Sequence, residues 1–220
     1  MTVAIVPVKR FVNAKTRLSD GLSSGVRRAL AEAMVTDVLI ALRRARRVRE
    51  VIVVSGEQTV AALASGYDAA AVIDDPADAG HSGAATLGVH AAMRRGARRV
   101  LLLPGDCPTL DPAELDAMLD RTLDGPEVVV LPDRHGEGTN GLLLTPPDVI
   151  APAFGPGSRE RHERLAHEAR RRARCEVLEL PSVALDVDTP DDLEALRAAL
   201  DRTRGGAAHT RGLLARVERT

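Results

Sequence analysis

Short apolar runs alternate with longer amphipathic segments along most of this chain. Three of the runs, at residues 3–8, 50–55 and 99–103, consist mainly of Val, Ile, Leu and Ala, which is typical of strands that are covered on both faces. The complete set of predicted strands is residues 3–8, 50–55, 70–73, 99–103, 127–131, 139–144 and 175–180.

The amphipathic segments predict helices, and two of these helices have well-marked starts. Asp111-Pro112 and Thr189-Pro190 each put a capping side chain before a proline at the first helical position. The predicted helices are residues 24–44, 58–65, 83–95, 112–123, 159–174 and 190–202. Because strands and helices alternate, we expect a three-layer α/β fold with a mostly parallel sheet. Ligands in such folds bind at the carboxyl ends of the strands, so the loops that follow strands are the ones to inspect.

The length of 220 residues and the hydrophobic content of 45% fit one globular domain with a sizeable core. We expect this domain to span residues 1–200. The remaining residues, 201–220, are rich in arginine around Gly205-Gly206 and predict a basic, poorly ordered tail, with a role in oligomer contacts as the alternative. A monomer and a homodimer both remain open.

Charge and aromatic content argue against a nucleic-acid-binding protein. The formal net charge is −1, and only 1% of the residues are aromatic, so stacking platforms for bases are nearly absent. Two cysteines do not make a disulfide framework. The first residues enter a strand-like run directly, and no run reaches about 18 apolar residues. We therefore expect a cytoplasmic protein without a signal peptide or a membrane span.

The loop after the first predicted strand is strongly basic, because it carries Lys9, Arg10, Lys15 and Arg17 within nine residues. A triphosphate brings about four negative charges, and a loop between a strand end and a helix start is where they can be received. Arg17 can grip a phosphate through two parallel hydrogen bonds, whereas a lysine acts as a point charge. The alternative is an ordinary solvated basic loop. No Walker sequence is present, which argues against a P-loop NTPase.

Two acidic segments are candidates for a metal site. Asp106 directly follows the apolar run at 99–103, and its carboxylate is a hard oxygen ligand suited to magnesium, although a turn aspartate is an equal alternative. Asp186 and Asp188 lie on one face of an extended segment, and Asp188 is the better candidate because it ends that segment. Cys107 is interpreted as a small filler, since no activating histidine is near it in sequence.

Two glycine-rich segments predict contacts with a ligand. In residues 133–142, glycines allow close backbone approach while Thr139 and Asn140 bring hydrogen-bonding groups to a strand start, although a plain hairpin connection is the alternative. In residues 154–162, glycines and Ser158 precede a helix, which is an arrangement that binds anions. His162 in the first turn of that helix could reach a phosphate, but a surface histidine is the commoner outcome.

These elements occur together in a recognisable order. They are Pro7-Val8-Lys9, Ala14-Lys15-Thr16-Arg17-Leu18, Pro104-Gly105-Asp106-Cys107-Pro108, Gly138-Thr139-Asn140, Phe154-Gly155-Pro156-Gly157-Ser158 with Arg161-His162, and Asp186-Val187-Asp188-Thr189-Pro190. From about Val3 to Leu200, the chain resembles the CofC/FbiD family of coenzyme F420 biosynthesis. Members of that family guanylylate 2-phospho-L-lactate, phosphoenolpyruvate or 3-phosphoglycerate.

The resemblance implies a Rossmann-like nucleotidyltransferase fold and a magnesium-dependent transfer of GMP from GTP to a small phosphorylated acid. The residues that it implies are Asp106 and Asp188 as catalytic metal ligands, Lys15 and Arg17 as catalytic groups on the GTP phosphates, Thr139, Gly155 and Ser158 around the acid, and Lys9, Ser82 and Gly83 around the nucleotide. Phosphoenolpyruvate is the preferred acid, because this Ala- and Arg-rich chain looks like a high-GC bacterial sequence and bacterial members of the family commonly use that acid.

The chain departs from the family pattern at two places. Arg159 stands where the family usually has Phe, so we expect a more polar mouth of the acid site. Residues 80–85 lack the Leu-Asn expected in the guanosine-contacting stretch. Rival interpretations are a molybdenum cofactor guanylyltransferase, a sugar-phosphate cytidylyltransferase, a metal-dependent glycosyltransferase of related fold and a non-catalytic nucleotide-binding module. The first two usually have a glycine-rich first loop, whereas here no glycine precedes Gly21.

Overall fold

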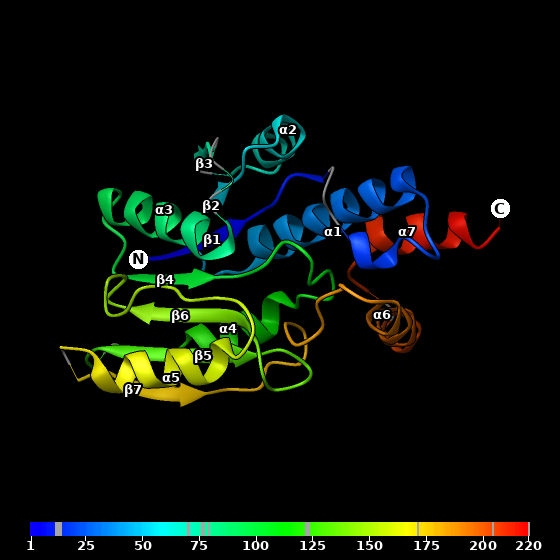
Figure 1. The fold of residues 1–220 in the computed structure, drawn as a ribbon. Coiled ribbons are helices and arrows are strands. Elements are labelled where there is room, and N and C mark those ends of the chain that lie inside the picture. Colours follow the sequence, from blue (N-terminus) through cyan, green and yellow to red (C-terminus); the bar gives the residue numbers. More distant parts are fainter. Residues whose placement is uncertain are drawn as a thin grey trace.

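The computed structural model describes residues 1–11, 15–69, 71–75, 78, 80–121, 124–170, 172–203 and 205–219, and these residues form one seven-stranded sheet (Figure 1). The strands are β1 (Thr2–Pro7), β2 (Glu50–Val54), β3 (Ala71–Ile73), β4 (Arg99–Leu102), β5 (Glu127–Pro132), β6 (Thr139–Thr145) and β7 (Arg174–Val177). Their order is β3-β2-β1-β4-β6-β5-β7. β6 runs antiparallel to β4 and β5, and the other pairs are parallel, which confirms the mostly parallel mixed sheet.

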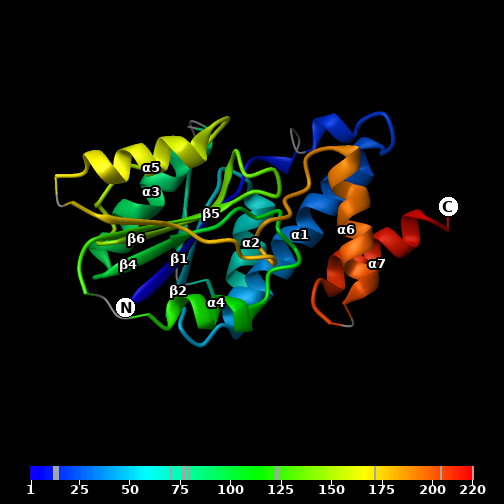
Figure 2. The same cartoon turned by 90° about the horizontal axis from the view of Figure 1, so that it is seen from below.

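Helices cover both faces of the sheet. They are α1 (Ser24–Arg44), α2 (Gln58–Gly66), α3 (Gly80–Arg94), α4 (Pro112–Leu119), α5 (Ser158–Glu168), α6 (Pro190–Arg202) and α7 (Ala208–Val217), with a short 3-10 turn, η2, at Thr16–Leu18. Figure 2 shows α3 and α5 on one face of the sheet and α1, α2 and α4 on the other. Helices α6 and α7 lie beside the N-terminal part of α1, with which they share a core. This is the predicted three-layer α/β architecture.

The side chains of the central strands alternate between two cores. In β1, Ala4 and Val6 pack into the core under α1, α2 and α4, whereas Val3 and Ile5 pack into the core under α3 and α5. Each fully buried Val or Ile side chain stabilises the fold by roughly 1.5–3 kcal/mol. Because both faces of these strands are covered, neither set of alternating side chains faces water, and polar residues are disfavoured at every position. This explains the continuous apolar runs in the sequence.

Predicted and observed boundaries agree best where a cap fixes the helix start. α1 and α6 have the predicted bounds, and the Asp111 carboxylate caps α4 by accepting from the backbone N–H of Ala113 at 2.8 Å. α5 is shorter than predicted, because it ends at Glu168, and β7 correspondingly begins at Arg174. Several predicted positions lie outside the described residues, namely Ala14, Ala70, Thr122, Leu123, Arg171, Arg204 and Thr220.

The expected poorly ordered tail was wrong for residues 208–217, which form helix α7. Asp37, a buried residue of α1, accepts hydrogen bonds from the backbone N–H groups of His209 at 3.1 Å and Thr210 at 2.8 Å. Leu214 is buried in a third core that α7 shares with α6 and the start of α1. A carboxylate at the helix start and an apolar face therefore dock α7 on the domain.

Among the helices of the described residues, none combines the length and the apolar character needed to cross a membrane.

Candidate active site

A cavity of about 600 Å³ opens at the carboxyl edge of the sheet, where the chain order reverses between β1 and β4. The antiparallel direction of β6 brings its first residues to this same edge, as the topology of such sheets favours. The described residues that line the cavity include eight of the predicted site residues, namely Lys9, Lys15, Arg17, Asp106, Thr139, Gly155, Ser158 and Asp188. Two predicted nucleotide neighbours, Ser82 and Gly83, are not among the described residues that line it.

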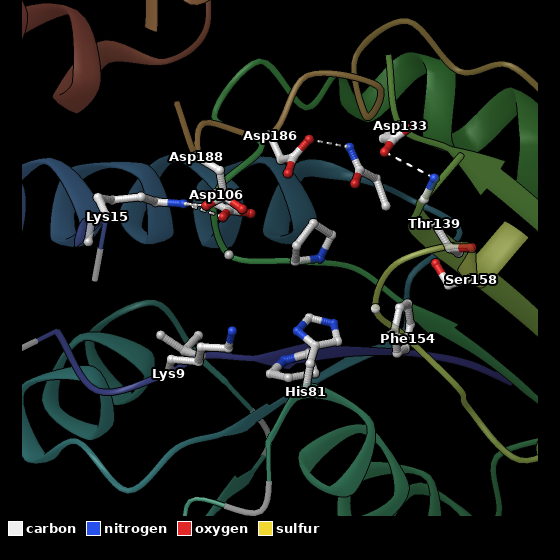
Figure 3. Close-up of a pocket in the computed structure, with 18 of the residues that line it drawn as sticks. Lys9, Lys15, His81, Asp106, Asp133, Thr139, Phe154, Ser158, Asp186 and Asp188 are labelled. Carbon is white, nitrogen blue, oxygen red and sulfur yellow. Dashed lines mark hydrogen bonds and ion pairs between the residues drawn. The ribbon is translucent and has the colours of Figure 1, made fainter. Parts of the chain in front are cut away.

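Lys15 joins the two acidic segments at one side of the cavity (Figure 3). Its ammonium donates to the Asp106 carboxylate and lies 3.0 Å from Oδ1 of Asp188, while only 7% of its side chain is exposed. Burial alone would lower the pKa of Lys15, but the two carboxylates outweigh burial and raise it above its usual value. Burial would raise the pKa of Asp106, and Lys15 reverses this and holds it below the usual value. Both groups are therefore charged at neutral pH.

The start of α6 holds Asp188 in this position. The Asp192 carboxylate accepts from the backbone N–H groups of Asp188 at 3.1 Å and Thr189 at 2.7 Å, and Thr189 in turn caps the helix. Arg134 reaches Asp192 at 2.7 Å from the loop before β6. The Asp192 carboxylate thus both completes the cap of α6 and holds the backbone that carries the Asp188 side chain.

The two carboxylates fit a hard divalent cation, because they already converge on one cationic group, the Lys15 ammonium. The neighbouring Asp186 also lines the cavity. Burial, followed by the charge of Asp106, raises the pKa of Asp186 to about 6. Among the described residues there is no group of three or more His, Cys, Asp or Glu side chains with metal-site geometry. A cation at this point would therefore be shared between protein carboxylates and other oxygens.

Asn140 fastens the segment that carries Asp186. Its side-chain amide donates to the backbone carbonyls of Val183 at 2.9 Å and Ala184 at 3.1 Å, and to Oδ1 of Asp186 at 3.1 Å. The Cys107 thiol, 1% exposed, donates to the same Val183 carbonyl at 3.2 Å. Burial, together with the Asp106 charge, raises the pKa of this thiol well above its usual value, so Cys107 is a structural link and not a nucleophile.

The opposite side of the cavity is the glycine-rich loop before α5. Gly155 has φ +117° and Gly157 has φ +65°, and these left-handed conformations favour glycine at both positions. Arg161 braces the loop, because its guanidinium donates to the carbonyls of Ala153 and Pro156, both at 2.9 Å. Ser158, 1% exposed, begins α5 at the cavity wall. The backbone N–H groups of Ser158 and Arg159 already donate to the carbonyls of Gly155 at 3.0 Å and Glu137 at 3.2 Å, so these two groups are not free to bind an anion.

The commoner surface location for His162 was wrong. Its side chain is 0% exposed, and its Nδ1 lies 3.0 Å from Oγ1 of Thr139. No local sequence pattern indicates this contact, because the two residues come from different elements. Arg159 pairs with Glu163 at 3.4 Å and is not among the described residues lining the cavity. The more polar mouth of the acid site stays a prediction.

His81 was not singled out by the sequence pattern, yet it lines the cavity between Lys9 and Phe154 (Figure 3). Its ring packs edge-on against Phe154, with ring centroids 4.4 Å apart. Burial lowers the pKa of His81, which favours its neutral form. The adjacent Ser82 accepts a hydrogen bond from the backbone N–H of Phe154 at 2.9 Å, so this predicted nucleotide neighbour supports the glycine-rich loop before α5.

The chain is similar to known proteins in sequence and in fold. Residues 2–211 match the family model described as "Guanylyl transferase CofC like". The chain is 56% identical over 220 residues to a phosphoenolpyruvate guanylyltransferase of Conexibacter woesei, covering 100% of this chain and 97% of that protein. It is 34% identical to a 3-phospho-D-glycerate guanylyltransferase of Colwellia psychrerythraea, covering 89% and 90%. A crystal structure described as a putative nucleotide-diphospho-sugar transferase from Desulfovibrio desulfuricans G20 has the same fold, with a TM-score of 0.73, 18% identity and coverage of 99% and 95%.

Proposed function

Because the chain belongs to the CofC-like guanylyl transferase family, we propose that it transfers GMP from GTP to a small phosphorylated three-carbon acid, with phosphoenolpyruvate as the preferred acid. The observation that carries the proposal is the division of the cavity. Lys15, Asp106 and Asp188 occupy one side, and Thr139 and Ser158 occupy the other. Such a site can hold a charged nucleotide and a small anion next to each other.

In the proposed reaction, a phosphate oxygen of the acid attacks the α-phosphorus of GTP. A new P–O bond forms there, and the bond from the α-phosphorus to the bridging oxygen breaks, so that pyrophosphate leaves. No general base is required, since a phosphate is already ionised at neutral pH. The product is a guanylylated acid, which the family resemblance connects to coenzyme F420 biosynthesis. GTP is a cytoplasmic nucleotide, so we expect the reaction in that compartment.

Lys15 and Arg17 are the proposed groups for charge on the leaving pyrophosphate. Both line the cavity after β1, and the Arg17 side chain is exposed there. Lys9 follows the same strand and faces the cavity across from the two aspartates (Figure 3). On the acid side, the backbone at Gly155 and the Ser158 hydroxyl are the proposed donors to the phosphate or carboxylate.

Asp106 and Asp188 are the proposed ligands of a magnesium ion, which when bound would supply positive charge for the phosphate oxygens. The carboxylate oxygens and the charge of this pair fit the ion, as the Lys15 ammonium between them indicates. The protein's own part is to hold both carboxylates close together. The α6 cap does this for Asp188, and the close packing at Gly105, where a Cβ would meet a Val35 methyl carbon at 2.9 Å, does it for Asp106.

The proposal is tested by incubating the purified chain with GTP, magnesium and each of the three candidate acids, while pyrophosphate release is followed. We expect release with phosphoenolpyruvate, and equal concentrations of the three acids in competition give the order of preference. A nucleotide-binding module would release none with any acid. A glycosyltransferase would react only with a nucleotide sugar, and release with CTP in place of GTP would contradict the guanylyl assignment.

A further inference from the structure

His162 makes two hydrogen bonds at the cavity wall, although its side chain is fully buried. Its Nε2 lies 2.9 Å from the backbone nitrogen of Ala153, and its Nδ1 lies 3.0 Å from Oγ1 of Thr139. The ring also packs edge-on against Phe154, with centroids 5.3 Å apart. The imidazole therefore has no freedom to turn without losing all three contacts.

These partners determine which ring nitrogen carries the proton. A backbone N–H can only donate, so Nε2 must accept from Ala153 and cannot carry hydrogen. A neutral imidazole then has its hydrogen on Nδ1. Burial, followed by the charge of Arg161, lowers the pKa of His162 to about 4, and the ring is accordingly neutral in the physiological range.

The direction of the second hydrogen bond follows from this tautomer. Nδ1–H of His162 donates, and Oγ1 of Thr139 accepts. The hydroxyl of Thr139 keeps its own hydrogen, which must be directed to another acceptor. Thr139 lines the cavity and lies beside Ser158 and Phe154 there (Figure 3). Within the described part of the chain, no second hydrogen bond is found for this hydroxyl.

We propose that His162 is a positioning residue that fixes Thr139 as a hydrogen-bond donor toward an anionic oxygen, phosphate or carboxylate, of the phosphorylated acid. This inference rests on the proposed function, because it assigns the acid to this side of the cavity. Without the imidazole, the Thr139 hydroxyl could donate into the wall, where it would offer the substrate only its lone pairs. An acceptor facing an anion is repulsive, so the hydroxyl would oppose binding instead of supporting it.

Two amide substitutions separate this role from a purely structural one. In His162→Asn, the side-chain NH₂ can take the place of Nδ1 and donate to Thr139, but the acceptor for Ala153 is lost. In His162→Gln, the side-chain oxygen can take the place of Nε2 and accept from Ala153, but the donor to Thr139 is lost. If His162 orients Thr139, the glutamine variant is the impaired one. If it only anchors the loop at Ala153, the asparagine variant is the impaired one.

The measurements are KM for phosphoenolpyruvate, KM for GTP, and the dissociation constant of phosphoenolpyruvate from calorimetry with the full chain and magnesium. We expect the glutamine variant to raise KM and the dissociation constant for the acid about tenfold to a hundredfold, the range for a lost hydrogen bond to a charged group. KM for GTP should stay within about twofold, and the asparagine variant should stay near the wild type. Equal acid affinities in the wild type and the glutamine variant, or a larger loss in the asparagine variant, would overturn the inference.

A double-mutant cycle adds a second readout. In a Thr139→Val background, the hydroxyl is absent, so His162→Gln should add almost nothing to the loss of acid affinity. If the fold-loss of acid affinity in the double variant equals the product of the two single-variant losses, His162 acts independently of Thr139, and the inference is overturned. A wild-type chain that binds phosphoenolpyruvate with this variant pattern but releases no pyrophosphate would contradict the proposed function alone. A wild-type chain that binds none of the three acids would contradict both.

Discussion

The ammonium of Lys15 lies 3.0 Å from Oδ1 of Asp188, which is 173 positions away in the sequence. The same ammonium also contacts Asp106, so a cation of the chain itself occupies the space between the two proposed metal ligands. In the proposed reaction, Lys15 would exchange its contacts with the aspartates for contacts with the phosphates of the nucleotide. A metal ion binding to the aspartates would compete with Lys15 until that exchange occurs.

We expect Lys15→Met to raise the affinity of the nucleotide-free protein for Mn²⁺ by about tenfold, because two carboxylates lose their internal counter-charge. The same change should lower the rate of GMP transfer by about a hundredfold or more, since a cation for the phosphates is lost. Mn²⁺ binding is measured by calorimetry without nucleotide. Lys9→Met is the control, because Lys9 lines the same cavity and has no ion pair with another described residue. An unchanged Mn²⁺ affinity in the Lys15 variant would show that the lysine does not compete.

Asp106→Asn should reduce pyrophosphate release by orders of magnitude while the fold persists. The amide is nearly the same size, but it removes the charge that Lys15 holds ionised in the wild type. Turnover at saturating substrates and the thermal unfolding midpoint are the two measurements. Asp186→Asn is the comparator, since its amide oxygen can still accept from Asn140, and we expect a clearly smaller loss. Normal GMP transfer by the Asp106 variant would end the proposed scheme.

Much of the fold could be predicted because its causes are local. A strand covered on both faces leaves a continuous apolar run, as β1, β2 and β4 do, and the start of α6 is encoded by Thr189 followed by proline. The positions of Lys15, Asp106 and Asp188 at one edge follow from parallel strands, since their carboxyl ends meet there. The clustering of these charged loops at one edge of the sheet could therefore be predicted from the sequence.

The parts that were missed depend on partners distant in the sequence. α7 begins where Asp37 accepts from the backbone of His209 and Thr210, and nothing in the arginine-rich segment itself signals this carboxylate. In the sequence, nothing distinguishes His162 from the other polar residues of a charged helix. The packing of α5 on β5 and β7 buries it beside Thr139. A role that depends on tertiary contacts cannot be predicted from the local sequence pattern.

Gly88→Ala should destabilise the protein by about 1–3 kcal/mol, because α3 packs closely on the sheet at this point. A Cβ added at Gly88 would meet Cγ2 of Ile5 at 2.3 Å and Cγ2 of Val54 at 3.1 Å. The measurement is the free energy of unfolding from urea titration. Gly25→Ala in α1 is the matched control, since nothing lies within 4 Å of its added Cβ, and alanine there should stabilise by about 0.5–1 kcal/mol. A neutral Gly88 variant would mean that α3 can move away from β1 at little cost.

Asp37→Ala should undock α7 and lower the free energy of unfolding by about 1–2 kcal/mol, as expected for loss of a helix-capping acceptor. The backbone N–H groups of His209 and Thr210, which donate to the Asp37 carboxylate at 3.1 and 2.8 Å, would lose their acceptor. Hydrogen exchange of the α7 amides measures the effect where it arises. Asp37→Asn, which keeps one acceptor oxygen, should fall between the wild type and the alanine variant. Unchanged exchange in the alanine variant would assign the docking to Leu214 and its apolar neighbours alone.

The buried His162 also makes a testable contribution to acid sensitivity. Its pKa is about 4 in the folded protein, against a usual value of 6.5, so the unfolded chain takes up a proton between these values and the folded protein does not. The stability that this group contributes is therefore complete above about pH 6.5 and is lost as the pH falls toward 4. Between about pH 7.5 and pH 5, the loss amounts to about 2 kcal/mol of the free energy of unfolding. His162→Gln does not titrate, so its urea-unfolding free energy should fall less over the same interval by about that amount. Parallel pH profiles for the two proteins would mean that the imidazole of His162 takes up a proton as readily in the folded state as in the unfolded chain.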